Sequence, residues 1–373
     1  MIYRTYGSTG VKVSAVGFGG MRFDEKNLDS CAALVKAAYD ADINYFDTAP
    51  GYGESEKIFG AAFKQMKKTR SQKPFCVSTK SMKADPQQVR KDLETSLKRM
   101  NLDYIDFYHS WCVLTFDKYR KRKASGVLKE FERLRDEGLI KHICVSTHMT
   151  GPDIGKMLRD YPFEGVLLGY SVMNFAYREA ALETAAKLNI GVVVMNPLGG
   201  GIIPQNPERF AFVKTQPDEA VVEGALRFLL SDPRITIGLV GFSKQKHIKE
   251  AVSAVEGYKP IPQKTIKRIR AGLSQSFNEL CTVCRYCDEC PQGIRVPELM
   301  DCYNHYVLTG KADDMIQRLD WHWGFVFEDD FLQNCTECGQ CEEACTQKLP
   351  IRERLRFIRE EVKKHLASKS TKQ

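Results

Sequence analysis

Long hydrophobic runs are missing from this chain. No apolar stretch is long enough to span a membrane, and the first residues, Met1-Ile-Tyr-Arg-Thr-Tyr, lack the basic and then apolar pattern of a signal peptide. Cysteine, by contrast, is abundant, with 13 among 373 residues. Because thiol-rich chains without a secretion signal are typical of reducing compartments, we expect a cytoplasmic protein with no membrane span.

A dinucleotide-binding fingerprint is also missing. The first Gly-rich turn reads Gly17-Phe-Gly19-Gly20 and runs into Met-Arg-Phe-Asp, so it lacks the G-x-G-x-x-G pattern that opens the first helix of a Rossmann fold. We find no flavin motif either, although this absence does not exclude a flavin.

The formal net charge of +8 is concentrated in two segments, Lys118 to Lys123 and Arg352 to Lys372. No nucleic-acid-binding motif accompanies them, so we do not expect a nucleic-acid partner. We interpret both segments as solvated helix faces, with the docking of an acidic redox partner as the alternative. In the tail, an apolar stripe opposes the basic residues: Leu355, Ile358, Val362 and Leu366.

Eight of the cysteines fall in two runs near the C-terminus. The runs consist of Cys281, Cys284, Cys287 and Cys290, and of Cys335, Cys338, Cys341 and Cys345. Thiolates at these spacings can hold iron–sulfur cubanes, with three ligands from one run and the fourth from the other. A zinc site normally uses two separated pairs, so further cysteines in each run would be surplus. We therefore predict two [4Fe-4S] clusters, with zinc or disulfides as alternatives.

The other cysteines are expected to be free thiols, most of them buried. They are Cys31, Cys76, Cys112, Cys144 and Cys302.

Short apolar runs alternate with helical patterns between about residues 14 and 245. The expected strands are Val13–Phe18, Ile43–Thr48, Phe75–Thr79, Tyr104–Tyr108, His142–Ser146, Gly165–Tyr170, Gly191–Met195 and Ile235–Val240. Helix candidates between them are Ser30–Asp40, Pro86–Met100, Val127–Glu137, Arg178–Leu188 and Asp218–Leu230. The strands are nearly uniformly apolar, as strands covered on both faces are. Eight strand–helix units predict an α/β fold of the (β/α)8 TIM barrel type, with a doubly wound sheet as the alternative.

The remaining segments complete a two-domain plan. Residues 1–14 should form an N-terminal β-hairpin that closes the bottom of the barrel. We expect loops at 111–126 and 204–212 to shape the substrate pocket, and a helix near 262–277 to end the barrel domain. The predicted domains are a barrel at 1–275 and a small iron–sulfur domain with a basic C-terminal helix at 276–373.

Four ionisable side chains lie at the ends of three successive expected strands and in an adjoining loop: Asp47, Tyr52, Lys80 and His109. Strand ends of a barrel meet at one mouth. Each residue alone has an ordinary structural explanation, but the set indicates catalysis. A phenol is a weak acid unless a cation such as Lys80 stabilises its phenolate. The set suits proton donation to a carbonyl as a hydride arrives, or the reverse.

The stretch Asp47-Thr-Ala-Pro-Gly-Tyr52-Gly, together with Lys80 and His109, resembles the tetrad of the aldo-keto reductase superfamily. The resemblance covers about the first 275 residues, and the tail resembles two-cluster bacterial ferredoxins. The whole chain is thus similar to the aldo-keto reductase branch with a fused iron–sulfur module. This resemblance implies that Tyr52 is the proton donor, that Lys80 and Asp47 tune it, and that His109 orients the carbonyl.

The resemblance also implies an NADP(H) site in the barrel mouth. The matching positions are Gly20, Met21, Asp47, Ser146, Asn196, Leu198, Ser243, Lys244 and His247. Other positions depart from the family's usual residues, namely Thr147 for an Asn, Leu167 for a Gln, Met195 for a stacking ring and Ala251 for an Asn. In the cysteine module, Thr346 replaces a usual proline and the first run is one residue short of the ferredoxin spacing.

Three functions therefore remain open. The first is an NADP(H)-dependent carbonyl reductase or alcohol dehydrogenase, with the clusters linking it to a redox partner or serving as structure. The alternative is an electron-transfer or redox-sensing protein that uses the barrel as a docking scaffold. A hybrid would reduce a substrate with one-electron donors and no nicotinamide. The substrate would be a small carbonyl compound or alcohol.

Overall fold

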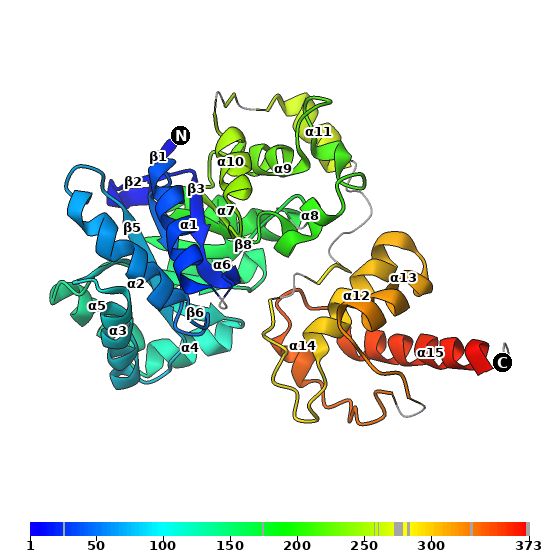
Figure 1. Ribbon diagram of the computed structural model, residues 1–373. Coiled ribbons are helices and arrows are strands. Elements are labelled where there is room, and N and C mark those ends of the chain that lie inside the picture. The colour runs from blue at the N-terminus through cyan, green and yellow to red at the C-terminus, as the bar shows by residue number, and fades with distance from the viewer. Residues whose placement is uncertain are drawn as a thin grey trace. The chain divides into compact units, whose positions relative to one another are not determined.

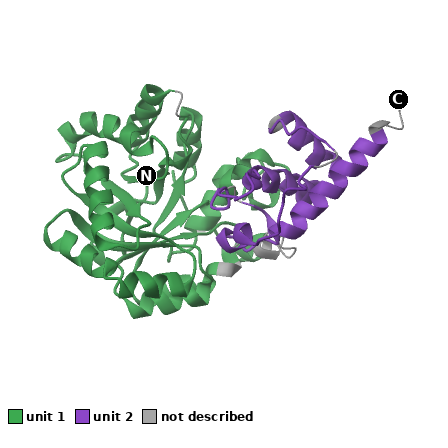
Figure 2. Cartoon of the chain, turned by 90° about the horizontal axis from the view of Figure 1, so that it is seen from below, with its two compact units in different colours: residues 1–275 green, residues 276–373 purple. Residues whose placement is uncertain are grey.

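The computed structural model describes the chain except residues 25–26, 174, 257, 260, 272–278, 282–283, 329–330 and 371–373. The chain divides into two compact units, residues 1–275 and 276–373 (Figure 2). The expected domain boundary at residue 275 lies outside the described residues. Among the residues that the structure describes, no helix is both long and apolar enough to cross a bilayer.

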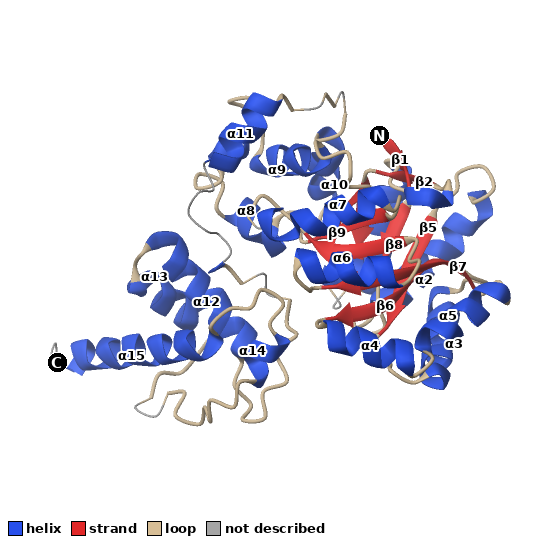
Figure 3. Cartoon of the chain, turned by 180° about the vertical axis from the view of Figure 1, so that it is seen from behind, coloured by secondary structure: helices blue, strands red, loops and turns tan. Residues whose placement is uncertain are grey.

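The N-terminal unit is a closed barrel of parallel strands with helices around it (Figures 1 and 3). Its strands are β3 (Val16–Gly19), β4 (Tyr45–Asp47), β5 (Cys76–Ser81), β6 (Ile105–Val113), β7 (Ile140–Thr147), β8 (Gly165–Gly169), β9 (Gly191–Met195) and β10 (Ile237–Val240). Each pairs with the next in chain order, and β10 closes the ring on β3. The (β/α)8 barrel prediction is confirmed.

Helices follow the strands as a barrel requires. They are α1 (Leu28–Asp40), α2 (Ser55–Met66), α3 (Pro86–Met100), α4 (Phe116–Ala124), α5 (Val127–Asp136), α6 (Gly151–Asp160), α7 (Glu179–Lys187), α8 (Ile202–Gln205), α9 (Val221–Leu230), α10 (Gln245–Ser253) and α11 (Gln263–Ala271). The ends of α3 illustrate why boundaries can be predicted. Asp85 caps its start by accepting from the Gln88 amide, Pro86 lies in its first turn, and Asn101 ends it with a φ of 55°.

A hairpin closes the N-terminal end of the barrel, as predicted. Strands β1 (Tyr3–Thr5) and β2 (Lys12–Ser14) pair antiparallel, and the Tyr6 ring beside them is fully buried. A Cβ atom on Gly191 would stand 2.3 Å from that ring, so only glycine leaves room for it. The expected strand Val13–Phe18 is in fact divided between β2 and β3, because its two halves pair with different partners.

Two expected loops contain helices, so those predictions were wrong. In segment 111–126, residues 111–113 extend β6 and α4 follows, with Thr115 as its cap. The basic residues of α4 are exposed except Arg122, which confirms a largely solvated helix face. Segment 204–212 contains the end of α8 and the start of the 3-10 turn η6 (Ala211–Val213).

In the C-terminal unit, the described residues with regular structure are helical. Its elements are α12 (Val296–Thr309), α13 (Ala312–Gln317), η8 (Arg318–His322), α14 (Gln340–Ala344) and α15 (Ile351–Ser370). Leu355, Ile358 and Val362 of α15 are buried in the core of this unit, as the stripe predicted. The Cys281 amide donates to Oδ1 of Asn304 at 2.7 Å, and Nδ2 of Asn304 donates to the Cys281 carbonyl at 2.8 Å.

None of the thirteen cysteines, all of them among the described residues, forms a disulfide, so the disulfide alternative is not found in this structure. The five solitary cysteines are buried, as predicted: Cys31, Cys76, Cys112, Cys144 and Cys302.

Candidate active site

Three of the four candidate catalytic residues lie on neighbouring strands. Asp47 ends β4, Lys80 lies near the end of β5, and His109 lies on β6. Lys80 and His109 are direct register partners, and Asp47 pairs with Ser78. Since alternate residues of a strand face the same side, these side chains share the barrel interior.

Lys80 and Asp47 form a buried ion pair. Lys80 is fully buried and Asp47 is 3% exposed, and the Lys80 ammonium donates to both carboxylate oxygens at 2.6 Å. The Ser78 hydroxyl also donates to Asp47, at 2.8 Å. Burial lowers the pKa of Lys80, whereas Asp47 opposes that shift by favouring the charged form. The carboxylate is therefore what keeps the amine protonated.

Tyr52 lies over this pair in the loop between β4 and α2. The Lys80 ammonium is 5.4 Å from the centroid of the Tyr52 ring, which is within the range of a cation–π contact. The Trp111 ring packs edge-on against Tyr52, with centroids 5.5 Å apart and an interplanar angle of 89°. The phenol is thus placed between a buried cation and an aromatic wall.

His109 is fully buried, and neither ring nitrogen makes a hydrogen bond of normal geometry to the described residues, although the nearby Val145 backbone favours the charged imidazole. Burial, and then the charge of Lys80, lowers the pKa of His109 to about 3. The imidazole is therefore neutral near pH 7, with one N–H to donate and one nitrogen to accept. A buried polar group without a partner is costly, which points to a ligand oxygen at this position.

The barrel interior has open space on the other side of the mouth. No atom lies within 4 Å of the position that a Cβ on Gly169, at the end of β8, would take. Two strand positions below it, Leu167 packs in an apolar layer with Val193 and Leu239. The mouth therefore has a charged half on β4 to β6 and an apolar half on β8 to β10.

The expected cofactor positions follow the ends of the strands. Gly20 and Met21 form the 3-10 turn η2 (Gly20–Arg22) after β3, Ser146 is buried on β7, and Asn196 follows β9 with a φ of 56°. Leu198 directly precedes η5 (Gly199–Gly201).

The other three expected cofactor residues lie at the start of α10. Lys244 is its N-cap residue, and the hydroxyl of exposed Ser243 is 3.3 Å from Nδ1 of His247. A helix N-terminus that follows a barrel strand and carries a lysine is a favourable place for a phosphate. Among the positions where the sequence departs from the family, Ala251 is fully buried in α10.

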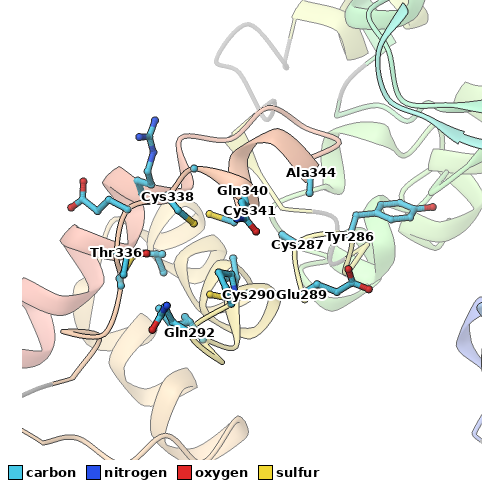
Figure 4. Close-up of a pocket in the computed structure, with 18 residues that line it drawn as sticks. Tyr286, Cys287, Glu289, Cys290, Gln292, Thr336, Cys338, Gln340, Cys341 and Ala344 are labelled. Atoms are coloured by element: carbon cyan, nitrogen blue, oxygen red, sulfur yellow. The ribbon is translucent and has the colours of Figure 1, made fainter. Parts of the chain in front are cut away.

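Cysteines from both runs line two cavities of the C-terminal unit. One has a volume of about 150 Å³ and is lined by Cys287, Cys290, Cys335, Cys338 and Cys341. Figure 4 shows Cys290, Cys338 and Cys341 around it. The other, of about 10 Å³, is lined by Cys281, Cys284, Cys287 and Cys345. Each cavity thus combines cysteines of both runs.

Further contacts surround the smaller cavity. The Cys284 thiol is 3.3 Å from the Thr346 hydroxyl, and the Leu349 amide donates to the Cys345 sulfur at 3.3 Å. Burial, with neighbouring Cys284 and Cys345, raises the pKa of Cys287 to about 12. Within the described part of the chain, no group of three or more His, Cys, Asp or Glu side chains lies close enough together to hold a metal ion, so the structure does not show the predicted clusters.

Sequence reasoning did not single out three further residues of the barrel site, although two of them lie in segment 111–126, which was expected to shape the pocket. Trp111 follows His109 by two positions on one strand, so the alternation of β6 could have revealed it. Ser78 precedes Lys80 by the same spacing on β5. Arg122 donates to the Trp111 carbonyl and is buried. It could not be identified from the sequence, because it lies in a run of basic residues that are otherwise expected to be exposed.

Comparisons with known proteins agree with this barrel. Residues 15–273 match the model of the aldo/keto reductase family. The chain is 28% identical over 315 residues to L-galactose dehydrogenase of Arabidopsis thaliana, a match that covers 74% of this chain and 95% of that protein. An uncharacterized oxidoreductase of Bacillus subtilis is 23% identical over 310 residues, covering 74% of this chain and 97% of that protein.

A solved aldo-keto reductase from Bacillus halodurans, in its holo form, has the same fold. Its TM-score is 0.61 at 22% sequence identity, and the match covers 73% of this chain and 96% of that one. The family match spans more than half of the chain and includes every strand of the barrel. The chain is therefore an oxidoreductase enzyme that belongs to the aldo/keto reductase family.

Proposed function

We propose that the barrel reduces a small carbonyl compound, or oxidises the corresponding alcohol, with NADP(H), and that residues 276–373 hold two [4Fe-4S] clusters. The observation that carries the barrel proposal is the buried Lys80–Asp47 pair beneath Tyr52, beside a neutral His109 that makes no hydrogen bond of normal geometry to the described residues. This set offers a proton donor, a fixed cation and a hydrogen-bond donor around one oxygen.

In the direction of reduction, the neutral His109 donates its N–H to the carbonyl oxygen and holds it beside the Tyr52 hydroxyl. As hydride arrives at the carbon, Tyr52 transfers its proton to the oxygen. The phenolate that remains is stabilised by the Lys80 ammonium, which lies 5.4 Å from the ring centroid. Asp47 keeps that ammonium charged in a site where burial alone would favour the neutral amine. In the reverse direction the same groups remove the alcohol proton.

The nicotinamide cofactor supplies the hydride, and the residues at the mouth fit such a group. Open space beyond Gly169 accommodates a ring, and Ser146 offers a hydroxyl beside it. Lys244 and the start of α10 suit the adenosine 2′-phosphate, which NADPH carries and NADH lacks, and this favours NADPH over NADH. L-galactose dehydrogenase acts on a sugar by its name, so a hydroxylated carbonyl substrate is one class to test.

The cysteine cavities support the cluster proposal because each brings together cysteines of both runs. A zinc site needs only four ligands, so it would leave cysteines of these runs unused. We assign Cys281, Cys284, Cys287 and Cys345 to one cluster, and Cys335, Cys338, Cys341 and Cys290 to the other.

The two cavities differ in how well they fit a cluster. The volume of the larger cavity, about 150 Å³, is about ten times the roughly 10–15 Å³ that a single water molecule requires. In the smaller one the sulfurs must move apart to admit a cluster. The clusters would supply one-electron transfer, which nicotinamide chemistry does not use directly, so they serve either a redox partner or the structure of the unit.

The second candidate function is electron transfer or redox sensing with the barrel as a docking scaffold. It is favoured by apolar Leu167 and Ala251 at positions where the family usually has amides. Losing a hydrogen-bond partner, for the carboxamide at Leu167 and for adenine at Ala251, costs on the order of 1–3 kcal/mol each.

Calorimetric titration of anaerobically purified protein with NADPH separates the two functions. Micromolar affinity and carbonyl-dependent NADPH oxidation are expected for the reductase. No binding at millimolar NADPH would overturn it in favour of the scaffold.

A further inference from the structure

Arg122 is a buried arginine on a helix whose other basic residues face solvent. It is 7% exposed, and no described carboxylate lies within ion-pair distance of it. Its guanidinium instead donates to neutral oxygens: Nη1 to the Ser110 hydroxyl at 3.2 Å and to the Trp111 carbonyl, and Nη2 to the Met82 carbonyl at 2.9 Å. One side chain thus ties the segment after β5 to the end of β6.

The hydrogen bonds from Arg122 stabilise the end of β6, where the backbone is irregular. The pairing of β6 with β7 shifts register between Ser110 and Val113. Cys112, inside this shift, has a φ of 55°, in the left-handed region that a residue with a side chain seldom adopts. Such irregularities re-aim side chains and persist only where the surroundings hold them. Arg122 bonds to both residues that precede Cys112.

The side chain that this irregularity aims is Trp111, which fits tightly against the loop of Tyr52. Its ring meets Tyr52 edge-on at 5.5 Å. A Cβ atom on Gly51 would stand 2.8 Å from Cη2 and 3.2 Å from Cζ3 of the same ring. The Trp111 ring therefore occupies the space of a side chain at position 51 and limits where the Tyr52 loop can lie.

We propose that Arg122 is a positioning residue that clamps Trp111 against the Gly51–Tyr52 loop and so holds the Tyr52 hydroxyl at the mouth. The inference rests on the proposed role of Tyr52. A planar guanidinium reaches the Met82 and Trp111 carbonyls together, whereas a single ammonium does not offer that fork. Arg122→Lys should therefore restore the function only in part.

The first test compares Arg122→Gln with Arg120→Gln. Arg120 is an exposed arginine of the same helix, paired with Asp117, and serves as the matched control. We expect Arg122→Gln to lower the kcat of NADPH-dependent benzaldehyde reduction at least about tenfold, because small misplacements of a catalytic group are costly. The Kd for NADPH should stay within about twofold, and Arg120→Gln should match the wild type. Equal kcat in the two variants would overturn the proposal.

The second test moves the same ring without touching Arg122. Gly51 has no positive φ, so Gly51→Ala adds a methyl group against Trp111 with no backbone strain. We expect the same loss of kcat as in Arg122→Gln. Both variants should also shift the emission of Trp111, recorded after the other tryptophans, Trp321 and Trp323, are changed to Phe.

The paired design keeps the outcomes distinct. If Arg122→Gln does not fold, Gly51→Ala decides: unchanged kcat or unchanged Trp111 emission refutes the clamp. If Tyr52→Phe keeps full activity, the proposed function fails. The Trp111 emission of Arg122→Gln still reports whether Arg122 holds the ring.

Discussion

Removing the charge of Asp47 should harm the protein more than removing the whole ion pair. In Asp47→Asn the Lys80 ammonium stays in a fully buried site without its counter-charge. At the 2.6 Å separation of the pair and an effective dielectric constant of 20, the lost attraction is about 6 kcal/mol. Part of this is recovered when Lys80 releases its proton, because burial already lowers its pKa. Breaking buried pairs typically costs about 3–5 kcal/mol, and we expect that range here.

The double variant Asp47→Asn/Lys80→Met provides the control. It removes both charges, so no buried ion is left unpaired, and its free energy of unfolding should return to within about 2 kcal/mol of the wild type. Its reductase activity should remain lost, because no cation stabilises the Tyr52 phenolate. Urea unfolding followed by circular dichroism measures the first quantity and NADPH oxidation the second. Single and double variants of equal stability, or an active double variant, would refute the reasoning.

Three further predictions concern other residues. Burial and the charge of Lys80 lower the pKa of His109 from its usual 6.5 to about 3, so the unfolded chain binds this proton more readily and stability declines as the pH falls from 6.5 toward 3. Relative to His109→Gln, the wild type should lose up to about 1.4 kcal/mol per pH unit in that window in urea unfolding. Cys345→Ser should lower anaerobic iron content from about eight to about four per chain, while Cys302→Ser leaves it unchanged; equal iron in both contradicts the ligand assignment. Lys244→Ala should weaken NADPH binding about tenfold, or roughly 1.4 kcal/mol, in calorimetry. A similar loss for NADH would argue against recognition of the adenosine 2′-phosphate, which NADH lacks.

The barrel could be predicted from sequence because its strands are covered on both faces and read as continuous apolar runs. Lys80 lies one residue from the end of β5, as expected, whereas His109 lies in the middle of β6, which continues to Val113. The two are register partners all the same. The expected strand Val13–Phe18 is divided into two strands that pair with different partners, and hydrophobic periodicity does not predict such a division. Both halves of that run are apolar, and only the partner strands differ.

The rest of the site depends on tertiary contacts that single-residue properties do not show. Helix α4 was expected to be a loop because most of its residues are charged. Its two buried residues, Tyr119 and Arg122, are three positions apart and so lie on one helix face. The fit of Trp111 against Gly51 depends on a register shift and a left-handed Cys112. No sequence pattern encodes those features.

The most direct test of the barrel mechanism is carbonyl-dependent NADPH oxidation by wild-type protein and Tyr52→Phe, with Tyr3→Phe as the control. Tyr3 is 45% exposed, lies in β1 of the hairpin that closes the N-terminal end of the barrel, and donates its hydroxyl to the Asp42 carbonyl. We predict that Tyr52→Phe lowers kcat by roughly 10²–10⁴-fold, with NADPH affinity preserved and Tyr3→Phe unaffected. A Tyr52→Phe enzyme as fast as the wild type would show that this hydroxyl does not protonate the substrate oxygen.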